Sequence, residues 1–130
     1  MNASGMPPRL RISTVNLSAA DVPALSSFYA ALLGYAVDDE DPEWHYLRAP
    51  DGTVALSVQH EPTHVPPVWP QTADDQQMQA HLEIRVDGEL EAALERAVSL
   101  GARAAAYQPQ DDVRVCLDPA GHPFCLWVAI

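Results

Sequence analysis

The chain carries one order of landmarks twice, and this internal duplication constrains the fold more than any other feature of the sequence. In each half, a strand-like segment leads to an aspartate, an amphipathic helical segment and a glycine, and a second glycine follows in a later turn. The matching landmarks are separated by nearly one distance: 66 residues for Asp21 and Asp87, 67 for Gly34 and Gly101, and 69 for Gly52 and Gly121. Three pairs in one register predict two copies of the same structural unit.

The first copy, residues 10–60, predicts a strand, a helix and three further strands. The segment LRISTVNLS (10–18) is rich in β-branched and apolar residues, as strands are. Asp21 is a helix N-cap, and Gly34 is placed to end the helix in a left-handed conformation. Three strands are then expected in residues 35–37, 43–49 and 53–60.

The second copy, residues 78–130, repeats this order. HLEIRV (81–86) predicts a strand, Asp87 is expected to open a helix that Gly101 ends, and three strands follow, the last two joined by a DPAG turn. Residues 61–77 hold four of the 12 prolines and are therefore expected to form a linker. We expect a disordered segment in residues 1–9 and one domain over residues 10–130.

The net charge of the chain limits the kinds of molecule that it is expected to bind. The formal net charge is −11, and all seven basic residues are arginines. Nucleic acids require a basic face, so we expect no nucleic-acid partner, whereas a cationic small ligand is compatible with this charge. The alternative is that the charge serves solubility alone. No apolar run approaches the ~18 residues of a membrane helix, and the N-terminus lacks the pattern of a signal peptide. We therefore expect a cytoplasmic protein without a membrane partner.

Together these features resemble the vicinal oxygen chelate superfamily, which includes glyoxalases, extradiol dioxygenases and bleomycin-resistance proteins. The resemblance is carried by the paired halves, the FYAALLGY segment (28–35) and the HLEIRVDG…LGA…DPAGHPF run. The PPVWP motif of the linker (66–70) is similar to that of small glyoxalase-like domain proteins. The resemblance implies an α+β fold in which two βαβββ modules form a curved mixed sheet with the helices on its outer face. It also implies a homodimer.

In metal-dependent members of the superfamily, the first and last strands of each module supply four metal ligands. The corresponding positions in this chain are Thr14, Leu56, His81 and Cys125. Only His81 is a good ligand for a hard or borderline divalent metal, and Leu56 cannot coordinate. We therefore expect no metal and no other cofactor, with Cys125 filling space as a small apolar residue. A metal bound through noncanonical ligands is the alternative.

Strand alternation predicts which side chains face the cavity of the sheet. Leu82 and Ile84 are expected to face the helices. The predicted cavity residues are Thr14, Asn16, Leu56, Val58, His60, His81, Glu83, Arg85, Cys125 and Trp127. Trp69 of the linker is expected either to cover a flat ligand in this cavity or to pack against a partner subunit. Apolar walls with a few convergent polar groups are typical of small-ligand pockets. The alternative that His81, Glu83 and Arg85 form a solvated strand face remains open.

These residues predict a protein that binds a small organic molecule, of cationic or aromatic character, without metal. The resemblance implies sequestration of the kind found in bleomycin-resistance proteins. The alternative is an enzyme of the same superfamily, either a metal-dependent glyoxalase, dioxygenase or lyase, or a metal-free catalyst. In the metal-free case, His81 and Glu83 would be the catalytic acid–base pair.

Overall fold

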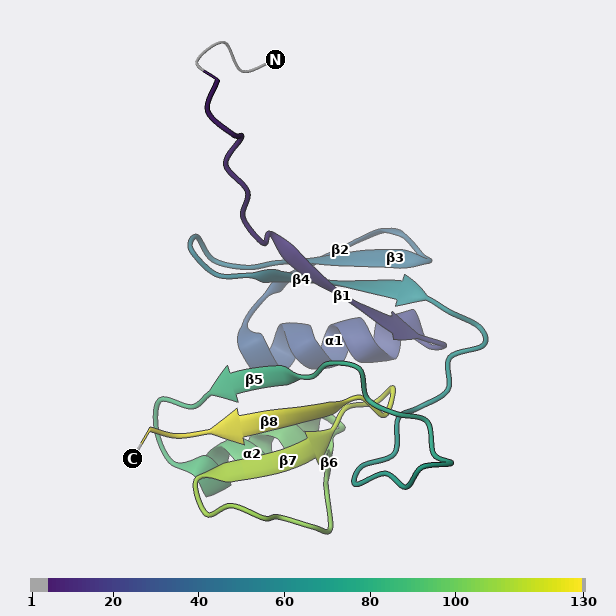
Figure 1. Ribbon diagram of the computed structural model, residues 1–130, viewed down its shortest axis with the longest axis vertical. Helices are drawn as coiled ribbons and strands as arrows, with labels where there is room; N and C mark the ends of the chain where they lie inside the picture. Colours follow the sequence, from purple (N-terminus) through teal and green to yellow (C-terminus); the bar gives the residue numbers. More distant parts are fainter. Residues whose placement is uncertain (1–4, 130) are drawn as a thin grey trace.

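The computed structural model describes residues 5–129 and contains two βαβββ modules in one chain (Figure 1). The first module consists of β1 (Thr14–Ala19), α1 (Val22–Leu33), β2 (Ala36–Asp41), β3 (Trp44–Arg48) and β4 (Ala55–His60). The second consists of β5 (Leu82–Arg85), α2 (Leu90–Leu100), β6 (Arg103–Ala104), β7 (Val113–Leu117) and β8 (Pro123–Trp127). The start of the predicted N-terminal segment, residues 1–4, and the last residue of the predicted second module lie outside the described residues. The arrangement confirms the predicted α+β fold.

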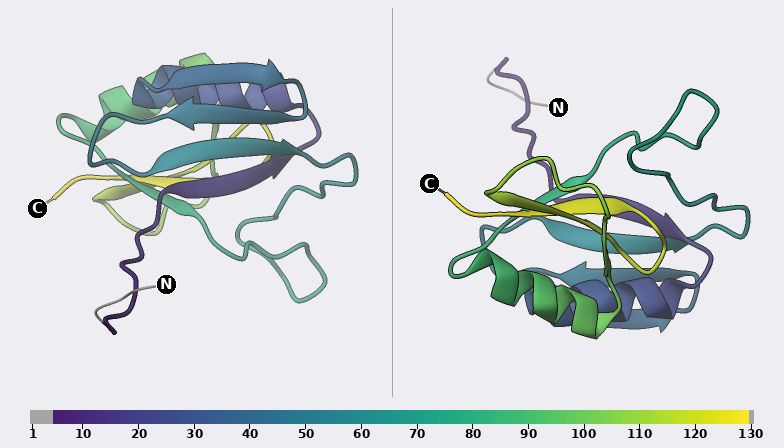
Figure 2. Two further views of the ribbon diagram at one scale, coloured as in Figure 1. Left: turned by 90° about the horizontal axis from the view of Figure 1, so that it is seen from above. Right: turned by 90° about the horizontal axis from the view of Figure 1, so that it is seen from below.

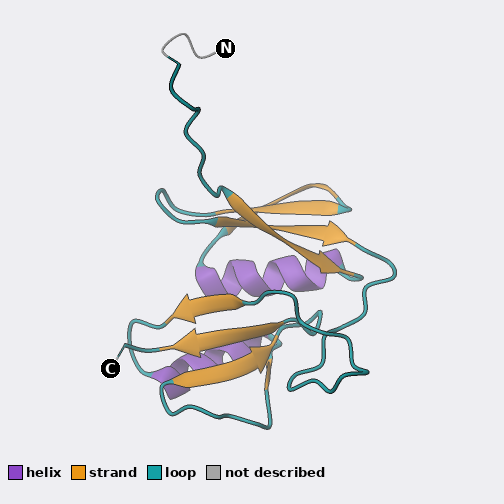
Figure 3. Ribbon diagram, viewed as in Figure 1, coloured by secondary structure: helices purple, strands orange, loops and turns teal. Residues whose placement is uncertain are grey.

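Each module builds one four-stranded mixed sheet, in the order β1-β4-β3-β2 and β5-β8-β7-β6 (Figure 3). The first strand of each module runs parallel to the last, and the remaining pairs are antiparallel. No described helix combines the length and the apolarity that a membrane crossing requires.

The helix ends follow from local sequence chemistry. The side chain of Asp21 accepts a hydrogen bond from the backbone N–H of Ala24 at 3.1 Å, and Gly34 ends α1 in the left-handed region at φ 72°. The expectation that Asp87 opens the second helix is wrong, because α2 begins at Leu90 after Glu89. The chain passes through Gly88 at φ 145° before the helix starts, and this conformation is not helical.

One hydrophobic core joins the two modules. It contains Leu25, Phe28 and Tyr29 of α1 together with Phe124 of β8. The ring of Phe124 lies 5.8 Å from that of Phe28 and 5.9 Å from that of Tyr29, between ring centroids. Figure 2 shows the two helices side by side, and Arg96 of α2 donates a hydrogen bond to the carbonyl of Ala31 of α1 at 3.1 Å. The modules are therefore packed as one body.

Candidate functional site

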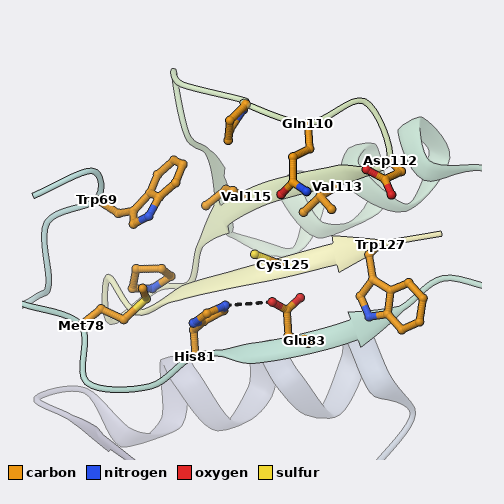
Figure 4. A pocket seen from close by; sticks show the side chains of 12 residues that line it. Trp69, Met78, His81, Glu83, Gln110, Asp112, Val113, Val115, Cys125 and Trp127 are labelled. Atoms are coloured by element: carbon orange, nitrogen blue, oxygen red, sulfur yellow. Dashed lines mark hydrogen bonds and ion pairs between the residues drawn. The ribbon is translucent and has the colours of Figure 1, made fainter. Parts of the chain in front are cut away.

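A pocket of about 500 Å³ opens on the face of the second sheet that points away from α2 (Figure 4). Strands β5, β7 and β8, the linker and the loop before β7 all contribute to it. Its lining residues are Trp69, Met78, His81, Glu83, Pro109, Gln110, Asp112, Val113, Val115, Pro123, Cys125 and Trp127.

The pairing register of the strands explains why these side chains share one face. Glu83 of β5 lies beside Cys125 of β8, which lies beside Val115 of β7. The next pair along the strands places Trp127 beside Val113. The intervening Leu82 and Ile84 pack against the core, as strand alternation predicts. One side of the sheet therefore supports the pocket, and the other side supports the fold.

The polar centre of the pocket is the group His81, Glu83 and Cys125. The Nε2 atom of His81 lies 2.9 Å from Oε1 of Glu83, and their side chains are 32% and 55% exposed. Cys125 is 8% exposed, and its burial, with a smaller contribution from the charge of Glu83, raises the pKa of the thiol to about 11. The thiol is therefore protonated at neutral pH and is a poor nucleophile.

Aromatic side chains stand at the two ends of the pocket (Figure 4). Trp69 of the linker stacks on Tyr107, with ring centroids 5.7 Å apart and the ring planes inclined by 18°. At the other end, the guanidinium carbon of Arg85 lies 5.6 Å from the ring centroid of Trp127. Arg85 is also 3.6 Å from the carboxylate of Asp87. It contacts the ring of Trp127 but is not among the residues that line the pocket.

Several lining residues were not predicted from the sequence. Gln110 and Asp112 lie in the loop before β7, while Val113 and Val115 lie on β7 itself. The DPAG turn could have identified the two valines, because a hairpin centred on that turn pairs Val115 with Cys125. No pattern in the sequence indicates that the loop before β7 folds over the sheet.

The prediction that Leu56, Val58 and His60 face the cavity is wrong. Leu56 and Val58 are 4% and 0% exposed and pack in the core on the helix side. His60 shares their side of β4, and its Nδ1 atom is 4.0 Å from Glu43. The turn before β4 is one residue longer than its counterpart before β8, so Ser57 takes the outward position that the duplication assigned to Leu56.

The predicted residues of the first module do not reach the pocket. Asn16 on β1 donates a hydrogen bond to the hydroxyl of Ser57 at 2.8 Å and lines a second cavity, of about 460 Å³, between β1 and β5. Thr14 also lies on β1, where its hydroxyl is 3.2 Å from that of Ser13. Of the predicted cavity residues, the pocket thus gathers Trp69, His81, Glu83, Cys125 and Trp127.

The residues do not fit the four-ligand metal set of the superfamily. Leu56 offers only carbon and is buried in the core, and Thr14 belongs to the other sheet. His81, Glu83 and Cys125 each offer one potential ligand atom, and these atoms lie within 4.8 Å of one another. This trio differs from the oxygen and nitrogen set in composition, because its third member is a protonated thiol.

Solved structures share this architecture. A glyoxalase/bleomycin resistance protein/dioxygenase family enzyme from Burkholderia phytofirmans matches with a TM-score of 0.70 at 18% identity, over 93% of this chain and 100% of that one. A possible glyoxalase from Bacillus cereus matches with a TM-score of 0.67 at 16% identity, over 92% of this chain and 99% of that one. The bleomycin-binding protein of Streptomyces verticillus, solved with copper(II)-bleomycin, matches with a TM-score of 0.60 at 18% identity, over 95% of this chain and 100% of that one. No curated protein matches the chain.

These likenesses define the class of protein as that of the glyoxalase/bleomycin-resistance fold. The model of the glyoxalase-like domain family matches residues 14–127, nearly the whole chain. The chain therefore belongs to the glyoxalase-like domain family, within the vicinal oxygen chelate superfamily.

Proposed function

We propose that the protein binds a small aromatic cation in the pocket of the second sheet and holds it without metal and without chemical change. One observation carries this proposal. The pocket has aromatic rings at both ends and two carboxylates, those of Glu83 and Asp112, and its lining contains no arginine or lysine. Such a lining favours a flat, positively charged ligand, because aromatic faces and carboxylates both attract cations.

The volume and the chemistry of the pocket support binding over covalent catalysis. A space of about 500 Å³ falls within the range of ordinary small-ligand sites. Cys125, with its pKa raised to about 11, is not an activated nucleophile. Sequestration of an organic cation needs only the packing surface and the charge that the site offers. The bleomycin-binding protein of Streptomyces verticillus, which was solved with copper(II)-bleomycin, shares the fold and supports a role in binding an organic molecule.

A matched pair of ligands tests the proposal. N-methylacridinium is a permanent planar cation, and acridine is its neutral parent at pH 8. We expect the cation to quench tryptophan fluorescence with the higher affinity, and this preference to weaken as salt is added. Glu83→Gln should weaken binding of the cation about 5- to 150-fold, which corresponds to the loss of a charged contact of about 1–3 kcal/mol.

Trp127→Ala should also weaken binding, whereas Trp44→Ala provides the control. Trp44 lies on β3 of the other sheet and is 46% exposed, outside the pocket. Equal affinities for the cation and the neutral parent, unchanged by Glu83→Gln and Trp127→Ala, would refute the proposal.

One contact favours a second candidate function, metal-free acid–base catalysis. The 2.9 Å contact between His81 and Glu83 orients the imidazole at the edge of the pocket, as in a general base held by a carboxylate. Such a base would exchange the α-proton of a hydroxycarbonyl compound for deuterium. NMR in D2O with a panel of 2-hydroxyketones tests this function. Exchange above the buffer rate that His81→Ala abolishes would establish it, and exchange at the buffer rate would reject it for those substrates.

A further inference from the structure

The second cavity, which lies between β1 and β5, adjoins the pocket of the second sheet. Three residues, Met78, His81 and Pro123, line both spaces. Figure 4 shows Met78 and His81 at the end of the pocket where Trp69 stands. A ligand bound in the pocket therefore meets the second cavity at this end, and the cavity offers about 460 Å³ in addition to the 500 Å³ of the pocket.

The linker forms part of both spaces. The backbone N–H of Val68 donates to the carbonyl of Gln76 at 3.0 Å and joins the two limbs of the linker. Residues of both limbs line the second cavity, whereas Trp69, in the loop that this hydrogen bond closes, lines the pocket. The first limb is fastened to the second module by His64, whose Nε2 atom lies 2.8 Å from the carbonyl oxygen of Ala120. One anchored segment therefore contacts whatever occupies either space.

The two spaces differ in charge. The pocket contains the carboxylates of Glu83 and Asp112, but none of the described residues that line the second cavity is an aspartate, a glutamate, an arginine or a lysine. Besides histidines, the polar residues of the second cavity carry amides and hydroxyls: Asn16, Ser18, Tyr29, Gln76, Gln77 and Gln79. Such a lining favours an uncharged group that forms hydrogen bonds, because a charge without a partner is costly to bury.

Several of these amides have donors or acceptors to spare. The side chains of Gln77 and Gln79 form no hydrogen bond with any described residue. Asn16 uses its Nδ2 atom to donate to the hydroxyl of Ser57 at 2.8 Å, and its Oδ1 atom remains an acceptor without a partner among the described residues. Because a carboxamide both donates and accepts, these groups match the amides and hydroxyls of a ligand.

We propose that the ligand of the pocket carries an uncharged appendage with amide or hydroxyl groups, and that this appendage occupies the second cavity. The inference rests on the proposed function, because the aromatic cation in the pocket anchors the appendage. The ligand is then a conjugate of two chemically different parts. Its charged ring lies near Glu83, and its neutral part passes His81 to reach the amides of Gln77 and Gln79.

Four ligands with the same acridinium ring test the inference. One is N-methylacridinium, and the other three carry an N-hexyl chain that is unsubstituted, ends in an acetamide, or ends in a glucose unit. Tryptophan quenching measures their dissociation constants. We expect the acetamide, the glucoside or both to bind at least about 10-fold more tightly than the plain hexyl compound, which is the scale of one or two neutral hydrogen bonds. A gain for only one of them identifies the amide or the hydroxyl as the group that is recognised.

Variants of the second cavity locate the gain. Gln77→Ala/Gln79→Ala should remove most of it, measured as the ratio of the dissociation constants of the plain and the appended hexyl compounds. Ala80→Phe should also remove it, because the larger side chain fills part of the cavity from an exposed position outside the pocket lining. Gln71→Ala is the matched control. It removes the same type of side chain from an exposed linker position that lines neither space, so the ratio should not change.

The outcomes separate this inference from the proposed function. If none of the four ligands binds, the proposed function is refuted and the inference with it. If N-methylacridinium binds but neither appendage improves on the plain hexyl chain, the inference alone is overturned. A gain that persists in both Gln77→Ala/Gln79→Ala and Ala80→Phe also overturns it, because the appendage then binds elsewhere. NMR of the labelled protein gives an independent readout, in which the appended ligands should shift the amide signals of residues 76–80 more than the plain hexyl compound does.

Discussion

At the scale of single residues, three side chains form the polar centre of the pocket. Burial keeps the Cys125 thiol neutral, with its pKa raised to about 11, while Glu83 is more than half exposed and is paired with His81. A metal ion would have to displace the proton of the thiol, since only the thiolate is a good ligand. It would also have to take the Glu83 carboxylate from its contact with His81. Both requirements oppose metal binding at this trio.

The first prediction at this scale concerns metal content. Protein reconstituted with zinc, nickel, manganese or iron and then desalted should retain far less than one ion per chain by elemental analysis. The reason is the cost of deprotonating Cys125 together with the lack of a good ligand at positions 14 and 56, where Thr14 offers only a neutral hydroxyl and Leu56 offers only carbon. Stoichiometric retention that disappears in His81→Ala would contradict this expectation and would identify His81, Glu83 and Cys125 as a metal site.

A buried pair of polar residues links the modules. The hydroxyl of Tyr29 on α1 donates to Oδ2 of Asp118 in the DPAG turn at 2.7 Å, and Asp118 is 3% exposed. Burial raises the pKa of Asp118, while the neighbouring His122 and the hydrogen bonds from Tyr29 and from two backbone N–H groups act in the opposite direction. These donors are what make the burial of this carboxyl group tolerable.

The second prediction follows from this pair. Tyr29→Phe should lower the free energy of unfolding by about 1–3 kcal/mol, because Asp118 then remains buried with one donor fewer. Tyr35→Phe is the matched control. Its hydroxyl donates to the carbonyl of Val54 at 3.0 Å in an exposed position, so its loss should cost no more than about 0.5 kcal/mol. Urea denaturation measures the free energy of unfolding of both variants. Equal losses in the two variants would show that the buried contact with Asp118 stabilises the protein no more than an exposed hydrogen bond does.

At the scale of elements, the linker is held against the second module at the DPAG turn. His64 contacts the carbonyl of Ala120 at 2.8 Å through Nε2, and Trp69 stacks on Tyr107. Gly121 lies directly beneath Pro66, and a Cβ atom built on this glycine would lie 2.6 Å from Cβ of Pro66. Close packing at this glycine therefore positions the linker, and with it the tryptophan at one end of the pocket.

The third prediction tests this close approach. Gly121→Ala should destabilise the protein by about 2–4 kcal/mol, from the strain of an alanine at φ 83° together with overpacking against Pro66. Gly34→Ala has nearly the same φ, 72°, with nothing within 4 Å of the added carbon, so it should cost only the strain, about 1–2 kcal/mol. Thermal or urea unfolding compares the two. A Gly121→Ala cost no larger than that of Gly34→Ala would mean that the linker moves freely at this point.

The same elements explain what the sequence could predict. The duplication and the helix stop signals predicted the order of the elements, and the resemblance to the superfamily implied how they assemble. The alternation of HLEIRV and of the last strand predicted His81, Glu83, Cys125 and Trp127 of the pocket. The face of β4 could not be transferred from its counterpart, because one extra residue in a turn reverses the face of a whole strand. The fold of residues 105–112 over the pocket depends on tertiary contacts, which leave no periodic pattern in the sequence.

At the scale of the whole molecule, negative charge on the outer edge of the first sheet opposes the addition of another strand. β2, AVDDED, is the end strand of that sheet, and all six of its residues are exposed. Four consecutive acidic side chains discourage another strand from adding to this edge. Residues 38–42 fall between two strands expected from the sequence, but Asp38 and Asp41 pair with β3, with a shift of register between them.

The last prediction is that the two modules unfold as one unit. Their shared core places Phe124 of the second module against Phe28 and Tyr29 of the first, so neither module buries its apolar face alone. Variants that retain a single tryptophan, either Trp44 on β3 or Trp127 on β8, report on the two modules separately. Their urea transitions should coincide with each other and with circular dichroism, as expected for a two-state domain. Separate midpoints for the two tryptophans would show that the duplicated halves are independent folding units despite their common core.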